Sequence, residues 1–258
     1  MNTQSKAELS DNSALLVKAQ KLLQKKFRQR ENLFLVEGVS TIFEGLNRKR
    51  IQNIFYSKNY KDNRNLLDLA HELEVNSYLV SERAIKALSD TKNPVEIMAV
   101  ASSTIGVLTP EDLENFRKIV YLDSVRDPGN AGTIIRGAAA FGIDAVCFSA
   151  DSVDPTNSKT IRATTGSIFQ VPIYVTSDLN IFEDKGFKIY LTAIDGELEL
   201  TQVPIDEKQV WVFSNEAHGM SEFKKPLKKV KIAIKPQTES LNVAQAATVI
   251  MFYLTNKI

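Results

Sequence analysis

The chain has 258 residues, of which 43% are hydrophobic and 24% are charged, as in most globular proteins. Its eight prolines and 11 glycines exclude a collagen-like or low-complexity chain. It has no apolar run of about 18 residues and no apolar signal-peptide core, so we expect a cytoplasmic protein without membrane contact. One cysteine (Cys147) excludes an internal disulfide, and two histidines (His71 and His218) leave little basis for a zinc site, so no metal is expected.

The net charge of +1 hides an uneven distribution. Residues 1–105 hold 16 Lys and Arg against 12 Asp and Glu, whereas residues 106–258 hold 16 against 19. Between residues 14 and 30 apolar residues recur at helical spacing, which predicts an amphipathic helix. The cations on this helix and at its exit are Lys18, Lys21, Lys25, Lys26, Arg28 and Arg30. They form either a phosphate-contacting surface or a solvated helix face, and both interpretations remain open.

Strands and helices alternate through the first part of the chain. The predicted strands are 33–36, 51–56, 77–80 and 97–101, and the predicted helices after residue 30 are 40–45, 65–73 and 84–88. This alternation predicts a small α/β domain over residues 1–105. Residues 102–114 contain Gly106, Thr109 and Pro110, which favour a linker.

A second alternation predicts another domain over residues 106–258. The predicted strands are 119–123, 145–149, 167–171, 188–193, 210–214 and 230–234, and the predicted helices are 133–141 and 242–254. Several of these runs are apolar on both faces, which is typical of strands in a buried parallel sheet. The whole chain is therefore predicted to be of the α/β class.

Three polar turns follow predicted strands of the second domain. The first runs from Leu122 to Gly132 and leads into a helix that contains Arg136, the second spans residues 213–220, and the third spans 234–242. A glycine-rich turn before a helix presents backbone N–H groups to an anion. Ligands of open α/β sheets bind beyond the carboxyl ends of the strands, so the three turns predict one composite site.

Missing motifs exclude several enzyme classes. The chain has no G-x-G-x-x-G dinucleotide fingerprint, no P-loop and no G-x-S-x-G nucleophile elbow. Glu216 and His218 lie close together in the second turn. A hydrolase or another small-molecule enzyme that uses these two residues therefore remains an alternative.

In combination, the motifs resemble a known family. The strings LDSVRDPGNAGTIIRGAAAFGIDAV (122–146), WVFSNEAHGMS (211–221) and IAIKPQTESLNVAQAATVIMFY (232–253) resemble the three signatures of the SpoU/TrmH class of RNA 2′-O-ribose methyltransferases, in the SPOUT superfamily. DPTNSKTIRATTGSIFQVP (154–172) resembles the segment that connects them. KKFRQRENLFLVEG (25–38) and NPVEIMAVA (93–101) resemble the accessory substrate-binding domain that often precedes the catalytic domain.

The resemblance implies a parallel sheet with a C-terminal trefoil knot, S-adenosylmethionine bound in that knot, and a homodimer formed through the C-terminal domain. The implied partner is RNA, with ribosomal RNA favoured and transfer RNA possible. The residues that match the family's functional positions are Asn130, Arg136, Glu216, Ser240 and Asn242. Those that match the cofactor-binding backbone are Ser214, Ile232 and Leu241, with Asn215 and Ile234 beside them.

Three residues depart from the family pattern. Ser214 stands where glycine is usual, and Ala233 and Pro236 replace a usual proline and glycine. Serine adds a side chain near the expected cofactor, and proline fixes φ and removes an N–H donor. The alternative function is therefore a non-catalytic RNA-binding or ribosome-assembly protein of the same fold, with weakened cofactor binding.

Overall fold

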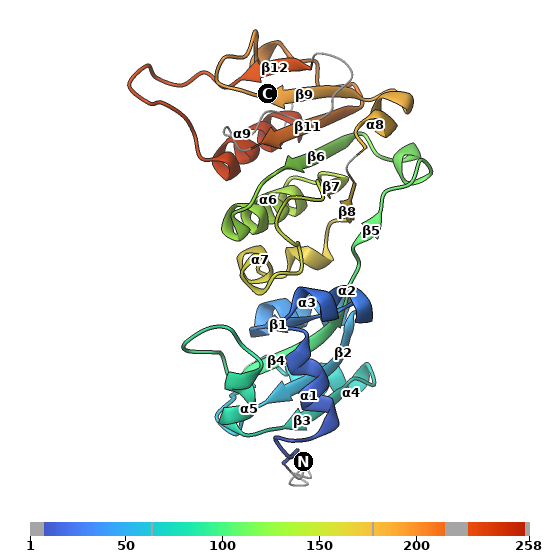
Figure 1. Cartoon of the computed structure of the whole chain (residues 1–258), viewed down its shortest axis with the longest axis vertical. Coiled ribbons are helices and arrows are strands. Elements are labelled where there is room, and N and C mark those ends of the chain that lie inside the picture. The colour runs from blue at the N-terminus through green and yellow to red at the C-terminus, as the bar shows by residue number, and fades with distance from the viewer. Residues whose placement is uncertain (1–7, 63, 177, 215–226, 256–258) are drawn as a thin grey trace. The chain divides into compact units, whose positions relative to one another are not determined.

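The computed structural model describes residues 8–62, 64–176, 178–214 and 227–255. Internal contacts divide the chain into two compact units (Figure 1). Unit 1 contains residues 1–103 together with 156–169, and unit 2 contains residues 104–155 and 170–258. The division of the sequence into domains at residues 105 and 106 stays a prediction.

Unit 1 is built on a four-stranded sheet with the strand order β1-β4-β2-β3. β4 pairs antiparallel with β1 and β2, whereas β3 pairs parallel with β2. The strands are β1 (Leu33–Glu37), β2 (Ile51–Tyr56), β3 (Asn76–Leu79) and β4 (Ile97–Ser102). The helices are α1 (Ala14–Lys21), α2 (Lys25–Glu31), α3 (Val39–Asn47), α4 (Leu66–Glu72), α5 (Glu82–Ala87), α7 (Ser158–Thr164) and the 3₁₀ turn η2 (Ser167–Phe169).

Successive side chains of each strand point to opposite faces of this sheet. Leu35, Phe55 and Met98 belong to a buried cluster that includes residues of α1 and α5. On β1 the neighbouring Phe34 stacks on Phe169 of η2, with ring centroids 5.9 Å apart. The segment that carries α7 and η2 is thus held to unit 1 by core packing.

Two predicted elements are corrected by the structure. The exit of the helix expected after residue 14 is itself a second helix, α2, and Gln24, which has an extended backbone, separates it from α1. The strand expected at 167–171 is wrong: η2 occupies its first three residues, and the strand β8 comes later, at Ile173–Val175. Thr165 and Gly166 both have positive φ, which ends α7 in a tight turn before the apolar residues begin.

Unit 2 contains an eight-stranded sheet in which every neighbouring pair is parallel, as predicted. Its strand order is β10-β12-β9-β11-β6-β7-β8-β5. The strands other than β8 are β5 (Gly106–Val107), β6 (Lys118–Asp123), β7 (Ala145–Phe148), β9 (Lys188–Thr192), β10 (Leu198–Glu199), β11 (Gln209–Ser214) and β12 (Lys228–Lys231). The helices are α6 (Pro128–Ala140), α8 (Asn180–Asp184) and α9 (Val243–Thr255), with 3₁₀ turns η1 (Asp112–Glu114) and η3 (Leu200–Gln202).

Both faces of the central strands of unit 2 are buried. Tyr121 and Val212 belong to a cluster that includes Phe182 of α8. α6 and α9 pack against each other, α6 also contacts β7, and α9 also contacts β11. At Gly137 of α6 a Cβ would lie 2.6 Å from the Cε of Met251 on α9, so a larger residue there would require the flexible Met251 side chain to move.

β12 is inserted between two strands that precede it in the chain. It pairs with β9 on one side and with β10 on the other. The trefoil knot that the resemblance implies stays a prediction. The turn before β10 makes room for β12 at Gly196, because a Cβ at this position would lie 2.5 Å from the backbone nitrogen of Lys231.

We predict that Gly196→Ala lowers the free energy of unfolding by about 1–3 kcal/mol, because the added methyl group displaces the backbone of β12. Urea denaturation followed by far-UV circular dichroism measures the change. Gly106→Ala is the control, because its Cβ would meet only the Tyr174 ring at an ordinary 3.4 Å. Equal stability of the two variants would contradict the close approach of the backbone at Gly196.

Candidate active site

The carboxyl ends of β6 and β11 lie side by side. Their last residues, Asp123 and Ser214, are partners in the parallel ladder. The first polar turn therefore leaves the sheet beside the place where the second begins. Residues 215–226, which include Asn215, Glu216 and His218, lie outside the described part of the chain.

A direct hydrogen bond joins the first and third turns. The Nδ2 of Asn242 donates to the Oδ1 of Asn130 over 3.0 Å. Each asparagine lies at the start of a helix: Asp127 caps α6 by accepting from the Asn130 backbone N–H, and Asn242 accepts from the Ala244 N–H at 2.8 Å. Two of the residues named by the resemblance, 112 positions apart, are thus brought together by the N-termini of α6 and α9.

Arg136 lies further into its helix than the sequence predicts. α6 begins at Pro128 rather than residue 133, because Asp127 caps it and proline suits the first helical position. Arg136 therefore follows the helix start by eight residues, or about 12 Å along the axis. Its side chain is exposed and has no ion pair or hydrogen bond with any residue that the structure describes. It remains available for an anionic ligand.

The backbone after β6 is held by a group of buried serines that the sequence pattern did not single out. The backbone N–H of Ser124 donates to Ser149 Oγ at 2.9 Å, and that of Val125 donates to Ser152 Oγ at 3.1 Å. Ser152 Oγ in turn donates to the Leu122 carbonyl at 3.0 Å. The turn after β7 therefore fixes the turn that leads to Asn130. The only sequence signal is the string Ser-Ala-Asp-Ser after a predicted strand, which ordinary turns share.

Two carboxylates beside these serines have opposite shifts in pKa. Hydrogen bonds from Ser124 and Ser149 lower the pKa of Asp151. Burial, and then the charge of Asp151, raise the pKa of Asp123. A firmly ionised carboxylate in the turn after β7 thus interacts with a carboxylate at the end of β6 that is harder to ionise.

The segment from Ile232 to Leu241, where the cofactor is expected, lies outside the helices and strands. Ile232, Ile234 and Leu241 are half-buried, whereas Ser240 is exposed. The backbone groups of Ile234 and Leu241 make no hydrogen bond to any other described residue. Neither Ser214 nor Ala233 has a positive φ, so a side chain at these two positions imposes no backbone strain.

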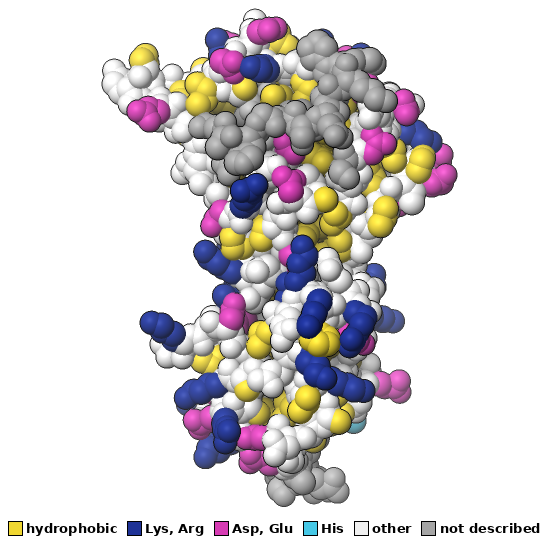
Figure 2. Space-filling model, in the orientation of Figure 1, with side chains coloured by type: hydrophobic (Ala, Val, Ile, Leu, Met, Phe, Trp, Pro, Cys, Tyr) yellow, Lys and Arg dark blue, Asp and Glu magenta, His cyan; other side chains and the backbone are white. Residues whose placement is uncertain are grey.

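The basic residues of the first two helices gather on one face of unit 1 (Figure 2). Three of the cations surround the ring of Phe27: Lys21 at 5.8 Å, Lys26 at 5.0 Å and Arg30 at 4.8 Å from its centroid. Lys18 and Lys25 are exposed nearby on α1 and α2. An aromatic ring bordered by cations is a surface on which nucleic-acid bases and phosphates can be held.

Arg28 differs from these cations because its side chain is buried, with 7% exposed. Its Nε donates to Thr156 Oγ1 at 3.1 Å, and its Nη1 donates to the carbonyls of Leu22 and Leu23 at 3.1 and 2.9 Å. The guanidinium therefore anchors the α1–α2 turn to the segment before α7. We accordingly leave Arg28 out of the proposed RNA-contacting set.

Membrane spans and metal clusters are both missing from the described residues. None of the described helices is long and apolar enough to cross a membrane. The described part of the chain also holds no group of three or more His, Cys, Asp or Glu side chains placed to bind a metal ion.

Two protein-family models match the chain. The SpoU rRNA methylase family model matches residues 117–252, and an MRM3-like substrate-binding domain model matches residues 16–99. The chain belongs to the SpoU rRNA methylase family. The resemblance seen in the three signatures is thereby confirmed.

Relatives extend the likeness over almost the whole chain. A 23S rRNA (guanosine(2553)-2′-O)-methyltransferase, RlmP, from Bacillus subtilis is 33% identical over 91% of this chain and 93% of its own. The 23S rRNA (guanosine-2′-O-)-methyltransferase RlmB of Nitrosomonas europaea is 26% identical over 78% of this chain and 82% of its own. The AdoMet-bound rRNA methyltransferase from Sinorhizobium meliloti has the same fold, with a TM-score of 0.79, 24% identity and 95% of both chains covered.

We predict that Ser149→Ala lowers the free energy of unfolding by about 1–3 kcal/mol, because the buried Ser124 N–H loses its acceptor. Hydrogen exchange at the Ser124 amide should accelerate in parallel. Ser240→Ala, which removes an exposed hydroxyl, is the matched control and should unfold like the wild type. Unchanged exchange at Ser124 in Ser149→Ala would refute the role of this serine in holding the loop.

Proposed function

We propose that this chain transfers a methyl group from S-adenosylmethionine to a ribose 2′-hydroxyl of ribosomal RNA. The observation that carries the proposal is the hydrogen bond between Asn130 and Asn242, which joins two of the family's signatures at the carboxyl edge of the parallel sheet. The names of the relatives, which include two 23S rRNA 2′-O-methyltransferases, support the reaction and favour 23S rRNA as its substrate. A cytoplasmic location is part of this proposal.

The described residues fit the cofactor. Its methionine and adenosine portions require hydrogen-bonding groups beside apolar surface, and the strip from Ile232 to Leu241 combines free backbone groups with half-buried isoleucine and leucine side chains. Ser214, at the end of β11, and Asn215 would complete the proposed cradle. When bound, S-adenosylmethionine supplies an electrophilic methyl group on a sulfonium. The thioether leaves as a neutral molecule, so the chain need not supply an acid to it.

The chain must therefore act on the ribose hydroxyl, which is a poor nucleophile until its proton departs. Arg136 cannot readily accept that proton, because a guanidinium stays protonated in proteins. We assign Arg136 the stabilisation of the developing alkoxide and the binding of an adjacent phosphate. A phosphate of the substrate or a water molecule would accept the proton.

The remaining site residues would position the substrate. Asn130 and Asn242, already bonded to each other, can present their remaining amide groups to the ribose. The exposed Ser240 hydroxyl can bond the RNA, and the proposed role of Glu216 is to hold Arg136 or the loop that follows β11. The basic face of α1 and α2 would add affinity for RNA phosphates.

The proposal includes a homodimer formed through unit 2. α9 exposes two large apolar side chains, Val249 at 41% and Phe252 at 44%. Phe252 also meets Phe141, at the end of α6, edge to face, with ring centroids 6.1 Å apart. A second copy of this surface would cover these side chains.

We predict that Arg136→Ala slows methyl transfer by roughly 100- to 1,000-fold, by analogy with the loss of an oxyanion-stabilising donor. Calorimetric titration should show S-adenosylmethionine binding at one site per chain in both proteins, since Arg136 faces the RNA in this proposal. Transfer to 23S rRNA is followed with a radiolabelled methyl group. Wild-type turnover by Arg136→Ala would refute its role, and failure of the wild type to bind the cofactor even with RNA present would favour the non-catalytic RNA-binding alternative.

We also predict that reversing both Lys25 and Lys26 to Glu weakens RNA binding and flattens its dependence on salt, because fewer counterions are released from the RNA. Fluorescence anisotropy with a 23S rRNA transcript at several salt concentrations measures both effects. The matched control reverses Arg83 and Lys86, two exposed cations of α5. If both double variants bind RNA equally well, α1 and α2 merely present a solvated face.

A further inference from the structure

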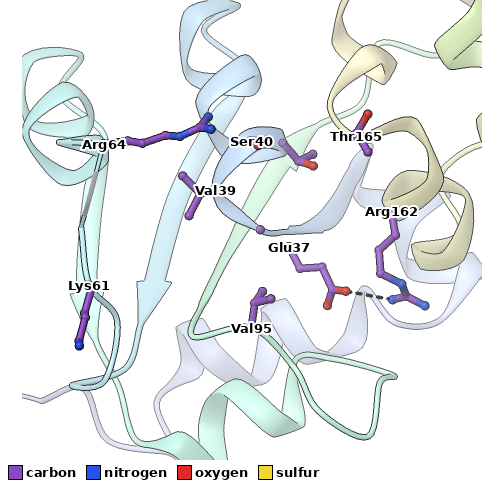
Figure 3. Close-up of a pocket in the computed structure, with 10 residues that line it drawn as sticks. Glu37, Val39, Ser40, Lys61, Arg64, Val95, Arg162 and Thr165 are labelled. Atoms are coloured by element: carbon purple, nitrogen blue, oxygen red, sulfur yellow. Dashed lines mark ion pairs between the residues drawn. The ribbon is translucent and has the colours of Figure 1, made fainter.

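Unit 1 contains a cavity of about 410 Å³ that the proposed function has not used (Figure 3). Its lining comes from the end of β1 and the start of α3, from the segments before α4 and β4, and from α7 and its C-cap. The lining residues are Glu37, Gly38, Val39, Ser40, Thr41, Lys61, Arg64, Val95, Arg162 and Thr165. Three of these ten residues are cationic and one is anionic.

The single acidic group of the lining is already neutralised. Glu37 pairs with Arg162 at 3.4 Å and accepts a hydrogen bond from Ser89 at 3.0 Å (Figure 3). Arg162 also pairs with Asp90 at 2.6 Å, and Asp90 accepts from Ser158 at 2.5 Å. This network pairs the charged side chains of one wall, so no free negative charge remains on it.

The opposite wall carries positive charge without partners. Lys61 and Arg64 are exposed, and neither forms an ion pair or a hydrogen bond with any residue in the described ranges. In Figure 3 the Arg64 guanidinium extends toward the first turn of α3, where Val39 and Ser40 lie. The two cations thus border a cavity whose other charges cancel.

The first turn of α3 adds hydrogen-bond donors to the same cavity. Gly38 caps this nine-residue helix without a side chain, so no side chain accepts from the N–H groups of the first turn. No acidic residue occupies that turn. Val39, Ser40 and Thr41 all line the cavity, and their N–H groups add to the field of Lys61 and Arg64.

We infer that this cavity binds a phosphodiester group of the RNA substrate, at a position separate from the surface of α1 and α2. The inference rests on the proposed function, since it names a further contact for the same RNA. Unpaired cations and free N–H donors recognise a phosphate, while Val39 and the 43% exposed Val95 offer apolar surface to the attached nucleoside. Arg162 and Thr165 come from 156–169, so a segment inside the matched methylase region completes a phosphate site in unit 1.

Substitution of Ser40 separates binding from stability. Ser40→Asp places a carboxylate among the donors of α3, where it competes with a phosphate but suits the helix N-terminus. We predict a melting temperature at or above that of the wild type, together with RNA binding weakened by about tenfold. Ser40→Ala retains the N–H group and should bind RNA nearly as well as the wild type. Wild-type RNA affinity in Ser40→Asp would overturn the inference.

Reversal of Lys61 and Arg64 to Glu tests the cationic wall. Binding of a protein-free 23S rRNA transcript should weaken, and the slope of log K against log salt should become shallower by about one unit. Arg83→Glu with Lys86→Glu again provides the matched double reversal, on exposed residues that do not line the cavity. Equal salt slopes for the two double variants would overturn the inference.

Two further measurements distinguish an RNA phosphate site from a free-anion site and from a failure of the proposed function. The Ser40→Asp protein should bind S-adenosylmethionine like the wild type, so failure of the wild type to bind the cofactor would refute the proposed function and not the phosphate site. Titration with inorganic phosphate distinguishes an RNA phosphate from a free anion. Saturation of the wild type at micromolar phosphate, lost in Ser40→Asp, would assign the cavity to a free anion and overturn the RNA inference; no saturation supports it.

Discussion

The in-register parallel pairing of β6 with β11 is the constraint on which the candidate site depends. It runs from Lys118 opposite Gln209 to Asp123 opposite Ser214. Because the strands are parallel and end together, both following turns leave the sheet at the same edge. A shift of the ladder by one residue would move every side chain of one strand to the other face and separate the two turns. The fully buried Trp211 and Tyr121 make such a shift costly.

The sequence was sufficient to predict the parts of the fold that depend on local pattern. β6, β7 and β11 are short apolar runs without polar alternation, and they form the centre of the parallel sheet as expected. The error at residues 167–171 shows the limit of that pattern. Ile168 and Phe169 are fully or nearly buried, as strand residues would be, but they pack from a 3₁₀ turn. Hydrophobicity indicates that a residue is buried, but it does not show whether that residue lies in a strand or in a 3₁₀ turn.

The parts of the site that escaped prediction depend on contacts between residues far apart in the chain. Arg28 belongs to a run of cations and resembles its neighbours in sequence, yet its guanidinium is buried against Thr156, 128 positions away. A buried guanidinium requires hydrogen-bond partners, and no local pattern reveals that they exist. The same holds for Ser149 and Ser152, whose hydroxyls accept from the backbone of another turn. The hydrogen bond between Asn130 and Asn242 was expected only as far as the resemblance placed both residues in one site.

The difference in net charge between the two units is larger than that between residues 1–105 and 106–258. Residues 156–169 include Lys159 and Arg162 and no acidic residue, so unit 1 has a net charge of +6 and unit 2 has −5. A negative unit 2 repels RNA in general, since long-range attraction depends on net charge. Under the proposed function, affinity would then come mainly from unit 1, through α1, α2 and the cavity beside α3. Unit 2 would contribute through a few directed groups such as Arg136 and the paired asparagines. This separation would let unit 1 hold many RNA sequences, whereas only a ribose that meets the donors of unit 2 would be methylated.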